Sequence, residues 1–294
     1  MSKFFAAIAA ILSGAVILLA TQHQTFRRVD AGGPMLRMLV VGNGSSTVVF
    51  EAGAGSSLEA WTRVQREVSQ FARTISYDRA GNGLSTKGAT PRDGRHVAIE
   101  LHTALRNVHI PPPYILVGHS LGGPYIRIFA GMYPDEVAGL VLVDPTQEEL
   151  IAWDNARKGQ PPAEHKFRPQ DEVNCAPMTF DDAHANPVPT NVPVVLITGL
   201  GPRETPGFLT KEFKAEVQQD RDVLYKAKLK FHKEWVEQFP NGQLIITENS
   251  GHGIPFEEPE LVIKTIRDVV KGTRPGTNSR DASGSNAYGP TRRR

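Results

Sequence analysis

The sequence predicts an α/β protein with a mostly parallel, doubly wound sheet and a short cap insertion. Runs of β-branched and apolar residues alternate with segments of helical periodicity along most of the chain, and this alternation favours a parallel sheet covered by helices on both faces. The chain has 294 residues, 40% of them hydrophobic, which is enough for one well-buried domain. The chemically informative motifs all follow predicted strands, where such sheets place their active sites.

The elements can be assigned in chain order from periodicity and from turn residues. We expect strands at 35–41, 47–50, 73–78, 114–117, 137–143 and 192–199, with a last strand inside 242–253. The first two flank a Gly-rich turn. We expect helices at 97–110, 122–132 and 258–272, one or two helices within 208–239, and one more that carries Trp61, Val64 and Val68 on one face.

Residues 146–190 interrupt this alternation, since they are polar, contain prolines and show only partial helical patterning. We interpret them as a cap over the site. The apolar side chains of Ile151, Trp153, Met178 and Phe180 either line an acyl or alcohol pocket or pack the cap itself. Residues 29–272 then form the folded domain, and 273–294, rich in Gly, Ser, Asn, Arg and Pro, are a disordered basic tail.

The first 28 residues have the composition of a signal peptide or an N-terminal membrane anchor. Lys3 precedes an uncharged apolar run at 4–20, and a small residue, Ala20, ends it. The run is slightly long for a cleaved segment and slightly short for a membrane span. We therefore expect export to the periplasm or the medium, or membrane association through residues 4–20.

Charge and cysteine content exclude several classes of function. The net charge is +2, and the tail alone carries +4. The rest of the chain is therefore slightly acidic, which gives no case for a nucleic-acid surface. The single cysteine, Cys175, allows no intrachain disulfide and lacks a thiol-activating context. No clustered Cys/His spacing indicates a metal, and we expect no metal and no organic cofactor.

The strongest motif is Gly118-His119-Ser120-Leu121-Gly122, which lies between a predicted strand and a predicted helix. It fits the G-x-S-x-G nucleophile elbow, in which a strained turn exposes the serine oxygen and the glycines leave room for close backbone. In that context we interpret Ser120 as a nucleophile. His119 occupies the variable position, where a structural role is expected.

A serine nucleophile needs a base and an orienting acid. His252 lies in the loop after the last strand, from which it can reach the elbow, whereas His102 and His232 lie within predicted helices. Two acids remain open: Asp144 directly follows one strand and also suits a turn cap, and Glu204 is the nearest carboxylate after the next strand.

Acyl transfer also needs donors for a developing oxyanion. The backbone N–H of Leu121, just after the nucleophile, is one candidate. The loop Gly53-Ala54-Gly55 follows a strand, and its glycines allow close backbone approach, so the N–H of Ala54 is the second candidate.

Taken together, "GHSLGG", "FEAGAG", "SYDRAGNGLS", "GLVLVDP" and "SGHGIPFEEPELV" resemble the α/β-hydrolase superfamily over residues 38–271. The resemblance implies that Asp78 and Arg79 are scaffold residues. Most members place the acid after the strand "VVLITG", where this chain has none directly; some, including haloalkane dehalogenases, place it one strand earlier, as Asp144 is. A serine at position 120 argues against dehalogenase and epoxide hydrolase activity.

The function expected from these residues is that of a serine hydrolase, carboxylesterase-like, which cleaves a small-molecule ester through an acyl-enzyme. Amide or peptide hydrolysis, lactone opening, acyl transfer and cofactor-free peroxidation use the same groups and remain alternatives. A non-enzymatic alternative is a binding module that uses this scaffold without catalysis.

Overall fold

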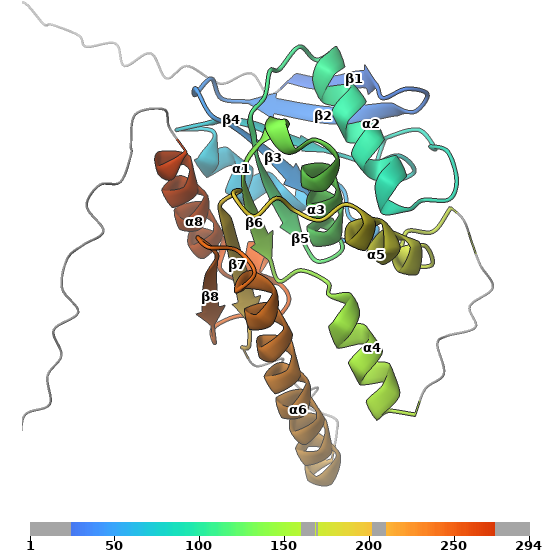
Figure 1. Cartoon of the computed structure of the whole chain (residues 1–294), viewed down its shortest axis with the longest axis vertical. Helices are drawn as coiled ribbons and strands as arrows, with labels where there is room; N and C mark the ends of the chain where they lie inside the picture. The colour runs from blue at the N-terminus through green and yellow to red at the C-terminus, as the bar shows by residue number, and fades with distance from the viewer. Residues whose placement is uncertain (1–24, 160–167, 169, 202–209, 274–294) are drawn as a thin grey trace, which may run out of the picture.

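A computed structural model describes residues 25–159, 168, 170–201 and 210–273. In this part of the chain, eight strands form one sheet in the order β1-β2-β4-β3-β5-β6-β7-β8 (Figure 1). The pairs β1–β2 and β2–β4 are antiparallel, and every other pair is parallel. The strands are β1 (Thr25–Asp30), β2 (Met35–Val41), β3 (Thr47–Glu51), β4 (Arg73–Tyr77), β5 (Tyr114–His119), β6 (Val137–Val143), β7 (Val194–Gly199) and β8 (Gln243–Thr247).

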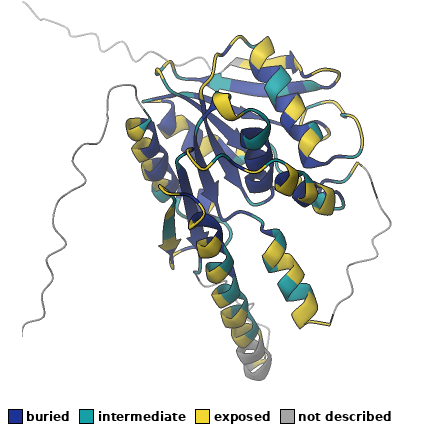
Figure 2. Cartoon of the chain, viewed as in Figure 1, coloured by how far each residue is buried: buried dark blue, intermediate teal, exposed yellow. Residues whose placement is uncertain are grey.

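Helices cover both faces of the sheet, as the alternation predicts. Two separate clusters of buried side chains lie on the two faces, one under α1, α7 and α8 and the other under α2, α3, α5 and the end of α6. Figure 2 shows most of the strands as a buried layer between them, with the edge strand β8 more exposed. The helices are α1 (Thr62–Val68), α2 (Gly94–Asn107), α3 (Gly122–Met132), α4 (Glu148–Arg157), α5 (Ala176–Ala185), α6 (Lys211–Val236), α7 (Ile254–Glu257) and α8 (Pro259–Gly272).

The N-terminal edge of the sheet differs from the sequence-based expectation in two respects. Strand β1 begins at Thr25, inside the segment 1–28 assigned to the leader, because its residues pair with β2 across a turn closed by Ala31 N–H and the Pro34 carbonyl (2.9 Å). Strands β2 and β3, expected on either side of one turn, are not sheet neighbours, because β4 lies between them.

The predicted leader run at 4–20 and the tail from 274 onward lie outside the described residues. Among the residues that are described, no helix has both the length and the hydrophobicity needed to cross a membrane.

The cap, residues 146–190, carries α4 and α5 between β6 and β7. Helix α5 packs on α2 and α3. Of the four apolar cap residues singled out from sequence, Phe180 is buried, whereas Ile151 and Met178 are exposed and Trp153 is half-buried. Phe180 is therefore packed within the protein, and the other three are partly or largely exposed.

Candidate active site

Ser120 occupies a sharp turn between β5 and α3, with φ at +53°, a left-handed conformation that a serine rarely adopts. Positions 118 and 122 have room only for glycine, because backbone atoms lie where a Cβ would be. A Cβ at position 118 would lie 2.5 Å from the carbonyl oxygen of Gly122, and one at Gly122 would lie 2.5 Å from that of Glu51. The two glycines thus allow the crowded turn that carries the serine at the carboxyl end of the sheet.

His252 lies in the loop between β8 and α7 and joins Ser120 to Asp144. Its Nε2 lies 2.9 Å from Ser120 Oγ, and its Nδ1 lies 2.6 Å from Asp144 Oδ2. Because an ionised carboxylate only accepts, Nδ1 carries the proton and Nε2 is left to accept from the serine hydroxyl. The imidazole remains 43% exposed, so a bound molecule can reach it.

Asp144 follows β6 directly and is buried, with only 2% of its surface exposed. Its Oδ1 accepts from the N–H of Gly199 (3.0 Å) and lies 2.5 Å from Lys228 Nζ. Burial alone raises the pKa of Asp144, but the hydrogen bond from His252 and the charge of Lys228 outweigh it and lower the pKa to about 2. The carboxylate is therefore ionised at neutral pH.

The other candidate acid, Glu204, lies within 202–209, outside the described residues. Asp144, the candidate acid that the structure describes, contacts His252 at 2.6 Å.

His119, the variable residue of the elbow, contacts the backbone of His252. Its Nε2 lies 2.8 Å from the carbonyl oxygen of His252, and its ring meets the edge of Trp61 with centroids 6.5 Å apart. Burial, aided by the neighbouring His252, lowers the pKa of His119 to about 4. The ring is therefore neutral at pH 7, and because a carbonyl only accepts, its proton is on Nε2.

The two candidate oxyanion donors flank the serine. Leu121 is the first residue after it, and Ala54 lies in the turn after β3. A Cβ at Gly53 would lie 3.3 Å from Ser120 Cβ, so this turn packs against the serine. Among hydrogen bonds between described residues, neither the Leu121 N–H nor the Ala54 N–H has an acceptor.

Sequence reasoning missed Lys228 and Glu172. Lys228 lies in the long charged helix α6, where it looks like one of many surface lysines, and no spacing connects it to Asp144. Glu172 lies in the cap, in a polar segment without a regular pattern, and pairs with Arg79 93 residues earlier in the chain. No local signal in the sequence indicates either contact.

Two other places with reactive or ligating side chains show no such arrangement. Cys175 is buried, and burial raises the pKa of its thiol, which disfavours the thiolate. Among the described residues, Glu148, Glu149 and His184 have ligand atoms within 4.8 Å of one another, but Glu148 is already paired with Arg127 at 3.2 Å.

Comparison with known proteins gives a consistent assignment of the fold. A family model described as alpha/beta hydrolase fold matches residues 46–180. The chain is 26% identical over 244 residues to the uncharacterized protein YqjL of Bacillus subtilis (strain 168), which covers 78% of this chain and 85% of YqjL. It is 32% identical over 124 residues to the Homo sapiens (lyso)-N-acylphosphatidylethanolamine lipase, covering 41% of this chain and 36% of the lipase.

Among solved structures, a thermophilic esterase from Thermogutta terrifontis superposes with a TM-score of 0.57 at 18% identity. The match covers 85% of this chain and 99% of the esterase. At this identity the likeness establishes the arrangement of the sheet and its helices.

Proposed function

The chain belongs to the α/β-hydrolase superfamily, and from that premise we propose that it is a serine hydrolase that cleaves a small-molecule carboxylic ester. The observation that carries the proposal is the hydrogen-bonded series Ser120–His252–Asp144, with contacts of 2.9 and 2.6 Å. A binding module without catalysis would not require this alignment, so the short contact of Asp144 to His252 favours an enzyme.

In the proposed mechanism, Ser120 Oγ attacks the ester carbonyl carbon while His252 Nε2 takes the hydroxyl proton. Asp144 stays ionised and stabilises the imidazolium. The N–H groups of Leu121 and Ala54 donate to the carbonyl oxygen as it becomes an oxyanion. Collapse of the tetrahedral intermediate expels the alcohol, which leaves with the proton from His252.

The second half of the cycle removes the acyl group. Water attacks the acyl-serine ester while His252 again acts as the base, and a second tetrahedral intermediate forms at the same donors. Its collapse returns the proton to Ser120 Oγ and releases the carboxylic acid. The reaction consumes one ester and one water and yields one acid and one alcohol, so it needs no oxidant or reductant.

The test is covalent labelling with a fluorophosphonate probe, combined with peptide mass spectrometry and hydrolysis of p-nitrophenyl esters. We expect the wild-type protein to be labelled at Ser120, and Ser120→Ala to lose both labelling and hydrolysis. Asp144→Asn is expected to lower kcat by roughly 10³–10⁴-fold, because an amide cannot stabilise the imidazolium as a carboxylate does.

Glu204→Gln serves as the matched carboxylate control and is expected to keep its activity. A loss with Glu204→Gln but not with Asp144→Asn would reassign the acid. Absence of labelling in folded wild-type protein would overturn the hydrolase proposal and favour a binding module.

Export or membrane anchoring through residues 4–20 is a further part of the proposal, supported by the apolar run that follows Lys3. Fractionation of cells that express the full chain, with N-terminal sequencing of the product, would test it. A full-length, cytoplasmic protein would contradict both forms of this proposal.

A further inference from the structure

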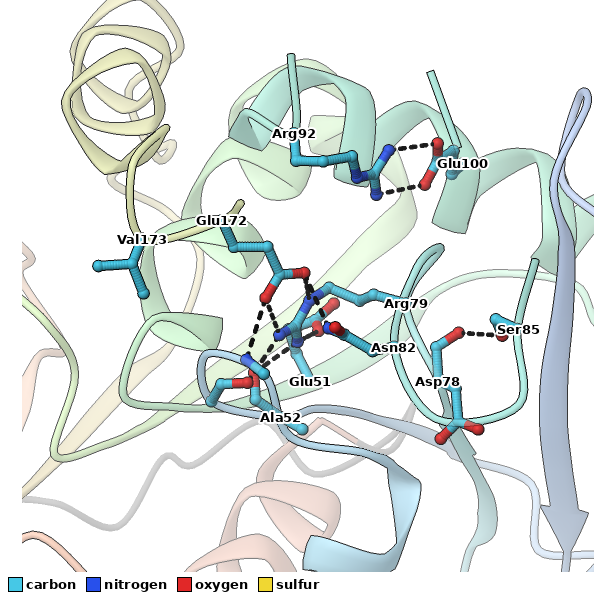
Figure 3. Close-up of polar contacts among 12 residues, drawn as sticks. Glu51, Ala52, Asp78, Arg79, Asn82, Ser85, Arg92, Glu100, Glu172 and Val173 are labelled. Carbon is cyan, nitrogen blue, oxygen red and sulfur yellow. Dashed lines mark hydrogen bonds and ion pairs between the residues drawn. The ribbon is translucent and has the colours of Figure 1, made fainter. Parts of the chain in front are cut away.

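Arg79 lies beneath the turn that carries the second candidate oxyanion donor. Its side chain is 1% exposed. Figure 3 shows the guanidinium among the polar contacts at this turn. Nη1 donates to the carbonyl oxygen of Ala52 and Nη2 to that of Gly53, each at 2.6 Å. Two consecutive carbonyls after β3 are therefore held by one buried cation.

These contacts determine the direction of an N–H group through the geometry of the peptide bond. The Gly53 carbonyl and the Ala54 N–H belong to the same planar trans peptide group, in which they point in opposite directions. When Arg79 holds the Gly53 oxygen on one side, the Ala54 N–H must face the other way. The hydrogen bond from Arg79 thus orients a donor that Arg79 does not itself touch.

Two buried carboxylates hold Arg79 in turn. Glu51 Oε1 accepts from Nη1 at 2.6 Å, and Glu172 accepts from Nε and Nη2 at 2.7 Å each (Figure 3). Glu172 also accepts from the N–H of Gly55 (3.2 Å) and from Asn82 Nδ2 (3.0 Å). The carboxylate from the cap therefore contacts both the arginine and the turn that the arginine supports.

The origin of these groups distinguishes Glu172 from the rest. Glu51 ends strand β3 and Arg79 lies two residues after strand β4, whereas Glu172 is supplied by the cap, residues 146–190. Bidentate pairing between guanidinium and carboxylate requires a defined relative orientation of the two planes. Contact between the cap and the sheet is therefore part of what holds Arg79 in place.

We propose that Arg79 is a positioning residue for the oxyanion turn, and that Glu172 of the cap locks it, so that the Ala54 N–H is aligned only when the cap is packed on the domain. This inference rests on the proposed function, since it concerns how the same site stabilises its oxyanion. It makes the cap a determinant of the rate of the chemical step.

The central variant is Glu172→Gln, which keeps the size of the side chain but removes the charge and one acceptor. Its matched control is Glu100→Gln. Glu100 makes a buried bidentate pair with Arg92, at 2.7 and 2.8 Å, away from the oxyanion turn and visible in the same view (Figure 3). Arg79→Lys, which keeps the charge but loses the forked geometry, is the third variant.

Kinetics on p-nitrophenyl acetate separate an oxyanion effect from a general loss of structure. We expect Glu172→Gln to lower kcat by roughly 10–100-fold and Arg79→Lys by roughly 100-fold, both with KM within about threefold, since loss of one oxyanion donor costs about 10²–10³ in kcat. A trifluoromethyl ketone, which forms a hemiketal oxyanion on the serine, should bind more weakly by a similar factor. Glu100→Gln should leave both quantities within about threefold.

A readout that does not depend on catalysis accompanies the kinetics. Hydrogen–deuterium exchange of a peptide that spans residues 52–57 should be faster in Glu172→Gln than in wild type, and unchanged in Glu100→Gln. Thermal unfolding of all variants shows whether each remains folded at the assay temperature.

The outcomes are distinct. Unchanged kcat and ketone affinity in folded Glu172→Gln, or an equal loss in Glu100→Gln, overturns the inference. If wild-type protein neither hydrolyses esters nor reacts with a fluorophosphonate, the proposed function fails. The exchange data then decide alone whether Glu172 holds the turn: faster exchange in Glu172→Gln supports that coupling, and unchanged exchange rejects it.

Discussion

Lys228 Nζ lies 2.5 Å from Asp144 Oδ1, while His252 Nδ1 lies 2.6 Å from the other oxygen of the same carboxylate. Lys228 also donates to the carbonyl oxygen of Gly199 at 2.7 Å. The buried aspartate is therefore shared between a lysine and an imidazole. This pairing keeps Asp144 ionised in spite of its burial, and it connects helix α6 to the ends of β6 and β7.

Replacement of Lys228 by methionine should reduce stability from neutral pH down to about pH 4, and the difference from wild type should shrink at lower pH. The folded-state pKa of Asp144, about 2, is below its ordinary value of 3.8, so its stabilising contribution is present above about pH 4 and is lost as pH falls towards 2. That contribution is about 2 kcal/mol. In Lys228→Met the pKa of Asp144 rises towards the ordinary value, so the contribution shrinks. Urea unfolding at pH 7, 4 and 3 would measure this.

The control for that experiment is Lys230→Met. Lys230 lies in the same helix, but its side chain is 65% exposed and is 3.8 Å from Glu234. An exposed pair of this kind contributes little to stability. Equal stability profiles for the Lys228 and Lys230 variants would contradict the role assigned to Lys228.

Replacement of His119 by phenylalanine should slow catalysis without weakening substrate binding. The change keeps a ring against Trp61 but removes the Nε2–H that bonds the His252 carbonyl. The His252 loop then loses one restraint, and we expect kcat to fall about tenfold with KM nearly unchanged, since misplacement of a base by a fraction of an ångström is costly.

His102→Phe is the corresponding control. His102 lies on α2, stacks on Tyr133 with centroids 3.9 Å apart, and contacts Glu136 instead of the site. Steady-state kinetics on both variants test this prediction. If kcat falls equally in the two variants, the effect does not depend on the contact between His119 and the His252 carbonyl.

The buried histidines should make the folded protein sensitive to mild acid well before Asp144 titrates. Burial lowers the pKa of His232 to about 4, and that of His119 is also about 4. Between pH 6.5 and 4 the unfolded chain therefore binds more protons at these sites than the folded one, and stability falls as pH falls. Each histidine contributes up to about 3 kcal/mol to this loss.

Urea denaturation between pH 7 and 4.5 tests this dependence, with His232→Gln as the variant. His232 Nδ1 lies 2.7 Å from Thr198 Oγ1, a contact that a glutamine amide can replace. The variant should lose less stability on acidification than the wild type. Identical slopes for the two proteins would show that His232 does not contribute.

Gly122, the last residue of the elbow, should not tolerate even one methyl group. A Cβ at Gly122 would lie 2.5 Å from the carbonyl oxygen of Glu51 and 2.7 Å from that of Ala52, and both are backbone atoms that cannot rotate away. We expect Gly122→Ala to destabilise the protein by about 1–3 kcal/mol. It should also lower kcat, because the displaced backbone leads into the oxyanion turn.

Gly272→Ala provides the comparison for Gly122→Ala. Among described residues, nothing lies within 4 Å of a Cβ at Gly272, which ends helix α8, and alanine favours a helix by up to about 1 kcal/mol. Chemical denaturation should show a lower free energy of unfolding for Gly122→Ala and an unchanged or higher one for Gly272→Ala. An unchanged free energy of unfolding in Gly122→Ala would contradict the packing described at the elbow.

Much of the site can be located from local sequence because its parts are tied to strand ends. The elbow around Ser120, the loop of Ala54 and the loop of His252 each follow a recognisable strand, and parallel strands place their carboxyl ends along one edge. The contacts among these groups could be anticipated for that reason. The position of β4 between β2 and β3 could not, because pairing between strands depends on long-range contacts that no turn motif encodes.

The sequence by itself determined the fold class, identified Ser120 and His252 as the candidate nucleophile and base, and left two candidate acids. Each of these depends on periodicity or on a motif a few residues long. Only the tertiary structure decided that Asp144 meets His252, that Lys228 shares this carboxylate, and that Glu172 reaches Arg79 from the cap. The physical reason is that charge pairing acts over a few ångströms in space between residues 84 to 108 positions apart in the chain, and such pairs leave no periodic pattern in the sequence.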